Sequence, residues 1–150
     1  MNIEEAITHF SHSELINPSE IPRPQISYDD LQFVLYLEEE NNRICLVKSQ
    51  SENKHYVIKF FDSEELDMSN SFLRESRLAS LRHPNIIDVL VSDRVEIKTE
   101  DSQSMSYNYV VMELALYGDF SDLFVYDKLS HDDKFVRTYF RQLIDGLEFL

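Results

Sequence analysis

Glycine is scarce in this chain of 150 residues, because only Gly118 and Gly146 occur. Glycine supplies positive φ angles and lets the backbone approach a ligand closely, so few positions offer either property. The single cysteine, Cys45, excludes an internal disulfide and fits a reducing compartment. It lies in the apolar run RICLVK, where a small buried side chain is the ordinary role.

Basic residues are also few, since 14 Lys and Arg stand against 28 Asp and Glu, for a net charge of −14. Nucleic acids and anionic membranes bind clustered Lys and Arg, so we expect neither as a partner. The sequence shows no signal-peptide pattern and no apolar run of membrane-spanning length, and no Cys/His spacing indicates a metal site. We therefore expect a soluble cytoplasmic protein, whose 43% hydrophobic content suffices for one domain or part of one.

Five strand-like runs rich in β-branched and aromatic residues follow residue 30. LQFVLYL, RICLVKS and HYVIKFF occupy residues 31–37, 43–49 and 55–61, with short polar breaks between them. NIIDVLVSDRVEIK and YNYVVMEL occupy residues 85–98 and 107–114, joined by a polar loop over residues 99–106. These runs predict an α+β fold with a five-stranded antiparallel sheet.

Two helices are predicted around these strands. Helical periodicity begins near residue 67 and should end at His83, because a residue that precedes proline disfavours the helical conformation. A second apolar stripe predicts a final helix over residues 131–150, with Ser130 and Asp133 resembling a capping box. Residues 1–30, whose latter half carries three prolines, are expected to form an extension outside the core.

Lys59 is anomalous within its strand. At period two it shares a face with Val57 and Phe61, and the opposite face is equally apolar, so both faces look covered. A covered ammonium either reaches water along its own stem or meets an anion from another element.

Glu75 is the matching anomaly in the predicted helix. At 100° per residue Met68, Phe72, Leu78 and Ala79 form an apolar stripe, and Glu75 falls in its middle. The simplest interpretation is that the carboxylate of Glu75 meets the ammonium of Lys59.

The order of these features resembles the first half of a eukaryotic protein kinase domain. YVIK is similar to the V-A-I-K motif, which would make Lys59 the lysine that holds the α- and β-phosphates of ATP. Glu75 would then be the helix C glutamate that pairs with this lysine. LRHPNII is similar to the H-P-N-I turn after helix C, although a gapless spacing from His83 would select Arg74 instead of Glu75.

The run YVVMELALYGDF resembles the kinase hinge. The resemblance implies Met112 as gatekeeper, the backbone of Glu113 and Ala115 facing the adenine, and Asp119 as a ribose contact. Asp119 also has a simpler interpretation as a helix cap. VRTYFRQLIDGLEFL resembles helix E of the large lobe, where Gly146 would serve close packing.

The resemblance therefore implies a kinase-like small lobe at residues 31–114 and the start of a helical large lobe at residues 115–150. It implies a serine/threonine-type protein kinase that binds ATP and Mg²⁺ and phosphorylates protein hydroxyls, with substrate and subfamily unspecified. The magnesium ligands, the H-R-D motif and the D-F-G motif are not among these 150 residues. We therefore expect the 150-residue chain alone to be inactive.

Two alternatives remain open at this point. The glycine-rich loop of the family should fall near residues 37–42, where the chain reads LEEENN without glycine. That acidic loop would repel phosphates, so a pseudokinase or kinase-like interaction module is the main alternative. An unrelated acidic α+β binding module, in which Lys59 and Glu75 do not touch, is the other.

Overall fold

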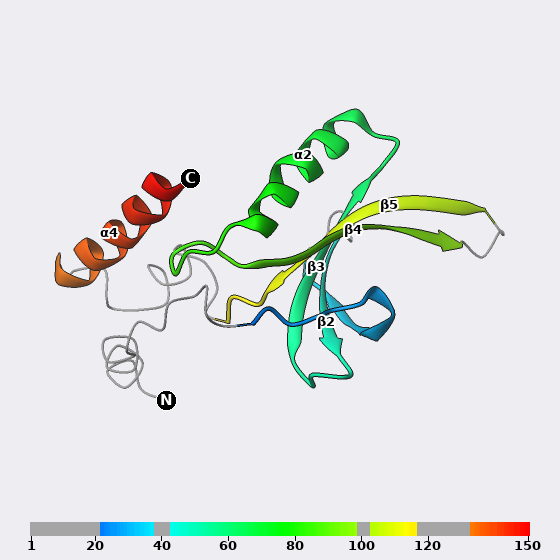
Figure 1. The fold of residues 1–150 in the computed structure, drawn as a ribbon, viewed down its shortest axis with the longest axis horizontal. Helices are drawn as coiled ribbons and strands as arrows, with labels where there is room; N and C mark the ends of the chain where they lie inside the picture. The colour runs from blue at the N-terminus through cyan, green and yellow to red at the C-terminus, as the bar shows by residue number, and fades with distance from the viewer. Residues whose placement is uncertain (1–21, 38–42, 99–102, 117–132) are drawn as a thin grey trace.

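The computed structural model describes residues 22–37, 43–98, 103–116 and 133–150, which form one α+β arrangement (Figure 1). In chain order the elements are η2 (Tyr28–Asp30), β1 (Leu31–Tyr36), β2 (Ile44–Ser49), β3 (His55–Asp62), α2 (Leu66–Ser76), η3 (Arg77–Ser80), β4 (Val89–Lys98), β5 (Ser104–Glu113) and α4 (Asp133–Phe149). None of the described helices is both long and apolar enough to cross a membrane.

The five strands form one antiparallel sheet in the order β1-β2-β3-β5-β4. This confirms the predicted α+β class and the antiparallel pairing. Strand β5 pairs with β4 on one edge and with β3 on the other, so β3 lies at the centre of the sheet. Helix α2 lies along one face of the sheet, as Figure 1 shows.

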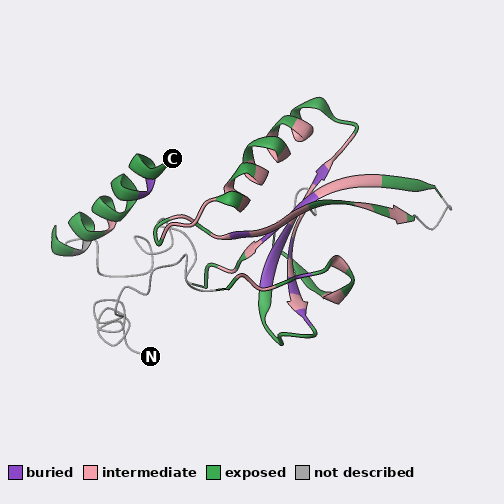
Figure 2. Cartoon of the chain, viewed as in Figure 1, coloured by how far each residue is buried: buried purple, intermediate pink, exposed green. Residues whose placement is uncertain are grey.

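Strand β3 divides its side chains between two apolar clusters, as the period-two pattern predicts. One cluster includes Tyr56 and Ile58, which pack with residues of β2 and β5 on the face away from α2. The other includes Phe61, which is fully buried beneath α2. The most deeply buried residues therefore follow β3 and its neighbour β5 (Figure 2).

Three element boundaries differ from the predicted ones by three residues or more. Helix α2 ends at Ser76 and tightens into η3, well before His83. Strand β4 begins at Val89 rather than at residue 85, because residues 83–86 form a turn in which the Ile86 N–H donates to His83 O at 3.1 Å. Strand β5 begins at Ser104, since pairing with Lys98 extends the hairpin into the predicted loop.

Helix α4 contacts the rest of the protein beside this turn. Gly146 is buried against it, and a β-carbon at Gly146 would lie 3.2 Å from the carbonyl oxygen of Asn85. The Phe149 ring stacks on His83 with 4.8 Å between ring centroids. The close-packing role predicted for Gly146 is therefore confirmed, although much of the apolar face of α4 is exposed, including Phe140 and Leu147.

The described part of the N-terminal segment does not lie outside the core as expected. Ile26 is 9% exposed and belongs to the cluster of Tyr56 and Ile58. The Tyr28 ring lies 5.3 Å from that of Tyr109, measured between centroids. Two prolines, at positions 22 and 24, keep this stretch extended, and an extended chain can lie along a sheet face as readily as it can leave it.

Asp30 fixes the end of this segment to the β2–β3 turn. Its carboxylate accepts hydrogen bonds from the Ser49 hydroxyl and from both the backbone N–H and the hydroxyl of Ser51, the latter two at 2.9 Å. These hydrogen bonds hold the pKa of Asp30 below its ordinary value of 3.8, and the bond from Ser49 has the largest effect.

We predict that the stabilisation from Asp30 disappears in acid. A lowered pKa in the folded state means that the contribution is present above the unfolded pKa of about 4 and is lost as the pH falls through the folded value. Urea unfolding of wild type and Asp30→Asn should therefore show a gap in unfolding free energy near neutral pH that closes only as the pH falls below about 4. Asp29→Asn is the control, and a gap that persists unchanged into acid contradicts the prediction.

Candidate functional site

Lys59 lies in the middle of β3, between Ile44 of β2 and Val110 of β5 in the register of the sheet. Val110 is fully buried, so the backbone around Lys59 is enclosed within the sheet. The side chain points to the face that α2 covers, the same face that carries Phe61. Its charge therefore emerges between the sheet and the helix.

The ammonium of Lys59 meets the carboxylate of Glu75 there. Lys59 Nζ donates to Glu75 Oε1 at 2.6 Å, and both side chains are 29% exposed. Lys59 Nζ also lies 5.1 Å from the centroid of the Phe61 ring, a cation–π distance. The contact that the sequence predicts is therefore present, while the role of either residue toward a ligand stays a prediction.

Glu75 reaches Lys59 because of the apolar stripe on which it lies. Met68, Phe72, Leu78 and Ala79 pack against the buried cluster around Phe61, which is the stripe read from the sequence. The Phe72 ring lies 5.7 Å from the Phe61 ring between centroids. A carboxylate in the middle of that stripe must face the sheet, whereas Arg74 is exposed.

The predicted hinge residues follow at the end of β5. Met112 pairs with Val57 and Val89 in the sheet and packs on the cluster beneath α2, so it lies on the same face as Lys59. The Glu113 N–H donates to Asp88 O at 3.1 Å, so a ligand at this edge would have to use the carbonyl of Glu113 instead.

Of the remaining predicted residues, the structure describes Ala115, which is exposed just beyond the end of β5. Asp119 and residues 38–42, which include the three glutamates of LEEENN, lie outside the described residues.

A cavity of about 470 Å³ lies beside the predicted hinge residues rather than at Lys59. Its lining comes from the turn at residues 84–87, from residues 113–116, and from Tyr139, Gln142 and Leu143 of α4. Glu113 and Ala115 are shared with the predicted adenine contact, but neither Lys59 nor Glu75 lines this space. The cavity and the pair of Lys59 and Glu75 are therefore separate features of the described residues.

Within the described residues, no group of three or more His, Cys, Asp or Glu side chains is placed to hold a metal ion. The histidine of the turn, His83, stacks on Phe149, and its Nδ1 accepts a hydrogen bond from the Asn85 N–H at 3.2 Å.

Comparison with known proteins adds no family assignment. No protein-family model matches the chain, and no curated protein is significantly similar to it. The functional argument therefore rests on the residues and their geometry.

Arg23 is a residue near the site that sequence reasoning missed. It contacts the end of η3 and Asp88, which itself bonds to Glu113 of the hinge. In the sequence, Arg23 stands out as a basic residue between two prolines in an acidic chain. That position does not indicate which residues it contacts.

We predict that Lys59 and Glu75 are energetically coupled. A double-mutant cycle with Lys59→Met and Glu75→Gln should give a coupling free energy of about 1 kcal/mol in urea unfolding, because each single change leaves a half-buried charge unpaired.

The control for this cycle is the pair of Arg43 and Glu65, which lie 3.5 Å apart with side chains 38% and 53% exposed. Water screens that pair, so its coupling should stay below about 0.5 kcal/mol. Equal coupling in the two pairs would show that the enclosed position of Lys59 has no special energetic effect.

Proposed function

We propose that this chain is the small lobe, hinge and first large-lobe helix of a serine/threonine-type protein kinase. In the complete domain it would bind ATP and transfer the γ-phosphoryl group to a protein hydroxyl. The observation that carries the proposal is the 2.6 Å contact between Lys59 of the central strand and Glu75 of the following helix. Both the order of the elements and the residue types agree with the kinase-like order of motifs in the sequence.

Lys59 has the free donors that a phosphate needs. An ammonium carries three N–H groups, and the contact with Glu75 uses one of them. Glu75 holds the flexible side chain in one direction, so less conformational entropy is lost when a phosphate binds. The partial exposure of Lys59 leaves a path to solvent on this face.

The second part of the proposal concerns the predicted hinge residues Glu113 and Ala115, at the end of β5 and just beyond it. Met112 lies on the same face as Lys59, one residue before Glu113, whose N–H is held by Asp88. That bond fixes the end of β5, so the carbonyl of Glu113 and the backbone of Ala115 form a defined edge for a planar base. We assign adenine contacts to these two residues and phosphate contacts to Lys59.

ATP supplies the transferred phosphoryl group, and the described residues supply its position. Lys59 orients the α- and β-phosphates, Glu75 orients Lys59, and the hinge backbone orients the base. The H-R-D and D-F-G motifs, which carry the catalytic base and a magnesium ligand in protein kinases, are absent from the 150 residues. We therefore assign to this chain nucleotide positioning without magnesium ligation or proton transfer.

A pseudokinase or kinase-like interaction module is the second candidate, and one observation favours it. LEEENN stands where a kinase carries glycines, and three consecutive glutamates there repel phosphate groups. In that case the pair of Lys59 and Glu75 serves only to hold α2 on the sheet.

Nucleotide binding separates the two candidates. Under the proposal, saturating Mg-ATP raises the melting temperature of the 150-residue chain by roughly 5 °C, the shift expected when ligand is about 100-fold above its dissociation constant. Lys59→Met should abolish that shift, because it removes the phosphate ligand. Differential scanning fluorimetry measures both.

Lys48→Met is the matched control. Lys48 lies on β2, on the same face of the sheet as Ile44, the residue that pairs with Lys59, but has no ion pair in the described residues. The variant should keep the full shift with Mg-ATP. No shift in wild type would support the interaction module, and a shift that survives Lys59→Met would contradict the assignment of Lys59.

A further inference from the structure

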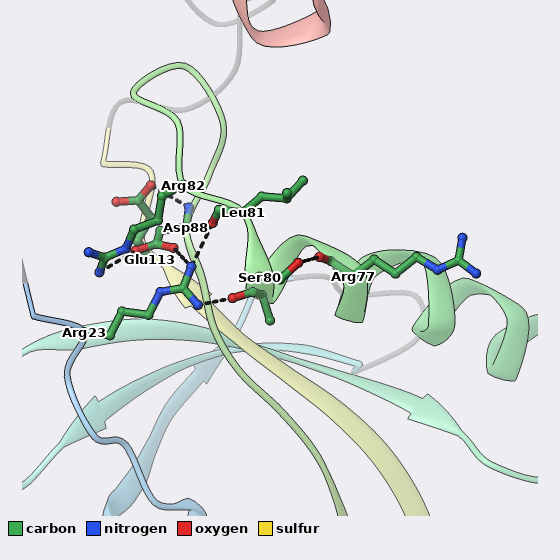
Figure 3. A network of polar contacts seen from close by, with 8 residues as sticks. Arg23, Arg77, Ser80, Leu81, Arg82, Asp88 and Glu113 are labelled. Atoms are coloured by element: carbon green, nitrogen blue, oxygen red, sulfur yellow. Dashed lines mark hydrogen bonds and ion pairs between the residues drawn. The ribbon is translucent and has the colours of Figure 1, made fainter. Parts of the chain in front are cut away.

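The segment at residues 22–30, here termed the N-terminal strap, contacts the sheet and the end of η3, the short helix that continues α2. Ile26 lies in the apolar cluster on the face away from α2, and Asp30 is bound to the β2–β3 turn. Arg23, at the other end of the strap, reaches the segment that follows α2 (Figure 3). One short stretch therefore joins parts of the protein that lie far apart in the sequence.

Arg23 makes three contacts with its guanidinium group. Nη1 donates to the carbonyl oxygen of Ala79, and Nη2 donates to that of Leu81 at 2.8 Å. Nη2 also lies 3.2 Å from Asp88 Oδ1, and the side chain of Arg23 is 29% exposed. Figure 3 shows Arg23 pointing toward Leu81 and Asp88 from the neighbouring strap.

The two carbonyls that Arg23 binds lie at a helix end, where carbonyls lack partners within the helix. Other carbonyls of this end are satisfied locally: the Ser80 hydroxyl donates to Arg77 O at 2.9 Å, and the Leu81 N–H donates to Leu78 O at 2.9 Å. A cation at the C-terminal end of a helix is also favoured by the helix dipole. Arg23 thus completes the hydrogen bonding of this end from a distant part of the chain.

The position of this end governs where Glu75 lies. Ala79 follows Glu75 by one helical turn, and it packs with Leu78 on the cluster that contains Phe61 and Val110. Lys59 pairs with Val110 in the sheet. A shift of residues 78–81 away from the sheet therefore moves Glu75 away from Lys59 as well.

The contact with Asp88 extends the effect to the hinge. The Asp88 N–H donates to Glu113 Oε1 at 2.9 Å, and the Glu113 N–H donates to Asp88 O at 3.1 Å. Arg82 Nη2 lies 3.7 Å from Asp88 Oδ2, on the other carboxylate oxygen. Arg23 therefore joins the end of η3 to Asp88, the residue that fixes the predicted adenine edge.

We infer that Arg23 is a positioning residue for the pair of Lys59 and Glu75, and that the N-terminal strap controls the placement of α2. The effect on the ion pair stands on the geometry alone. Its consequence for ATP rests on the proposed function, since a strap that releases α2 would lower nucleotide affinity without touching the nucleotide.

The first test measures the ion pair without any ligand. In the 150-residue chain, the coupling between Lys59 and Glu75 from a double-mutant cycle is compared with and without Arg23→Ala. The coupling can be expressed as a ratio of unfolding equilibrium constants, and we expect this ratio to fall at least about threefold. The reason is that Arg23→Ala removes the charge-assisted hydrogen bonds that hold residues 79–81 in place. Amide hydrogen exchange at residues 75–81 should become about tenfold faster, and exchange in β2 should change little.

Two further variants keep the test decisive. Arg43→Ala removes the arginine that pairs with Glu65 at the other end of α2, and it should leave the coupling unchanged. Arg23→Lys keeps the charge but loses the fork that reaches two carbonyls, so its effect should fall between wild type and Arg23→Ala. If Arg23→Ala fails to fold, the comparison of wild type with Arg23→Lys tests the inference instead.

The outcomes separate this inference from the proposed function. If Arg23→Ala lowers stability uniformly and leaves both the coupling and the exchange at residues 75–81 unchanged, the inference is overturned and Arg23 is merely structural. If the coupling falls but wild type does not bind Mg-ATP, the strap controls α2 and the kinase proposal fails alone. If the coupling falls and Mg-ATP binding weakens in Arg23→Ala but not in Arg43→Ala, both stand.

Discussion

A single charge on a covered sheet face constrains this structure more than any other feature. Lys59 lies on the central strand, and its ammonium emerges between that strand and a helix, where an unpaired charge would be costly. The helix must therefore bring a carboxylate to that point while it buries its apolar stripe on Phe61. Both conditions are met only if Glu75 lies within the stripe, which fixes the rotation of α2 and its height above the sheet.

This constraint explains why much of the central structure could be predicted from sequence. The alternation in β3 and the stripe of α2 are local periodicities, and each specifies a buried face without knowledge of the partner. Lys59 and Glu75 violate those patterns in complementary ways, so their contact could be inferred before the fold was known. The antiparallel sheet followed from the spacing of its apolar runs, whereas the strand order β3-β5-β4 had no local signature.

The features that sequence reasoning missed depend on contacts between distant segments. The early end of α2 and the late start of β4 belong to a region whose carbonyls and carboxylate bind Arg23, which is 56 to 65 residues away. Backbone carbonyls are present at every residue, so the sequence cannot show which of them an arginine will bind. Ile26 was assigned to an extension for a related reason. The prolines predict an extended backbone, but they do not indicate which part of the protein that backbone contacts.

The acidity of the chain bears on how a phosphate could bind to this face. The sequence LEEENN contains no glycine, the residue that lets a backbone approach phosphates closely, and its glutamates oppose an anion. Glu75 already neutralises much of the charge on Lys59. In the proposed site, the described residues offer a phosphate the N–H groups of Lys59 that Glu75 does not use, held in direction by that same contact. Under that proposal the placement of α2 would control phosphate affinity, because Glu75 of this helix directs the side chain of Lys59.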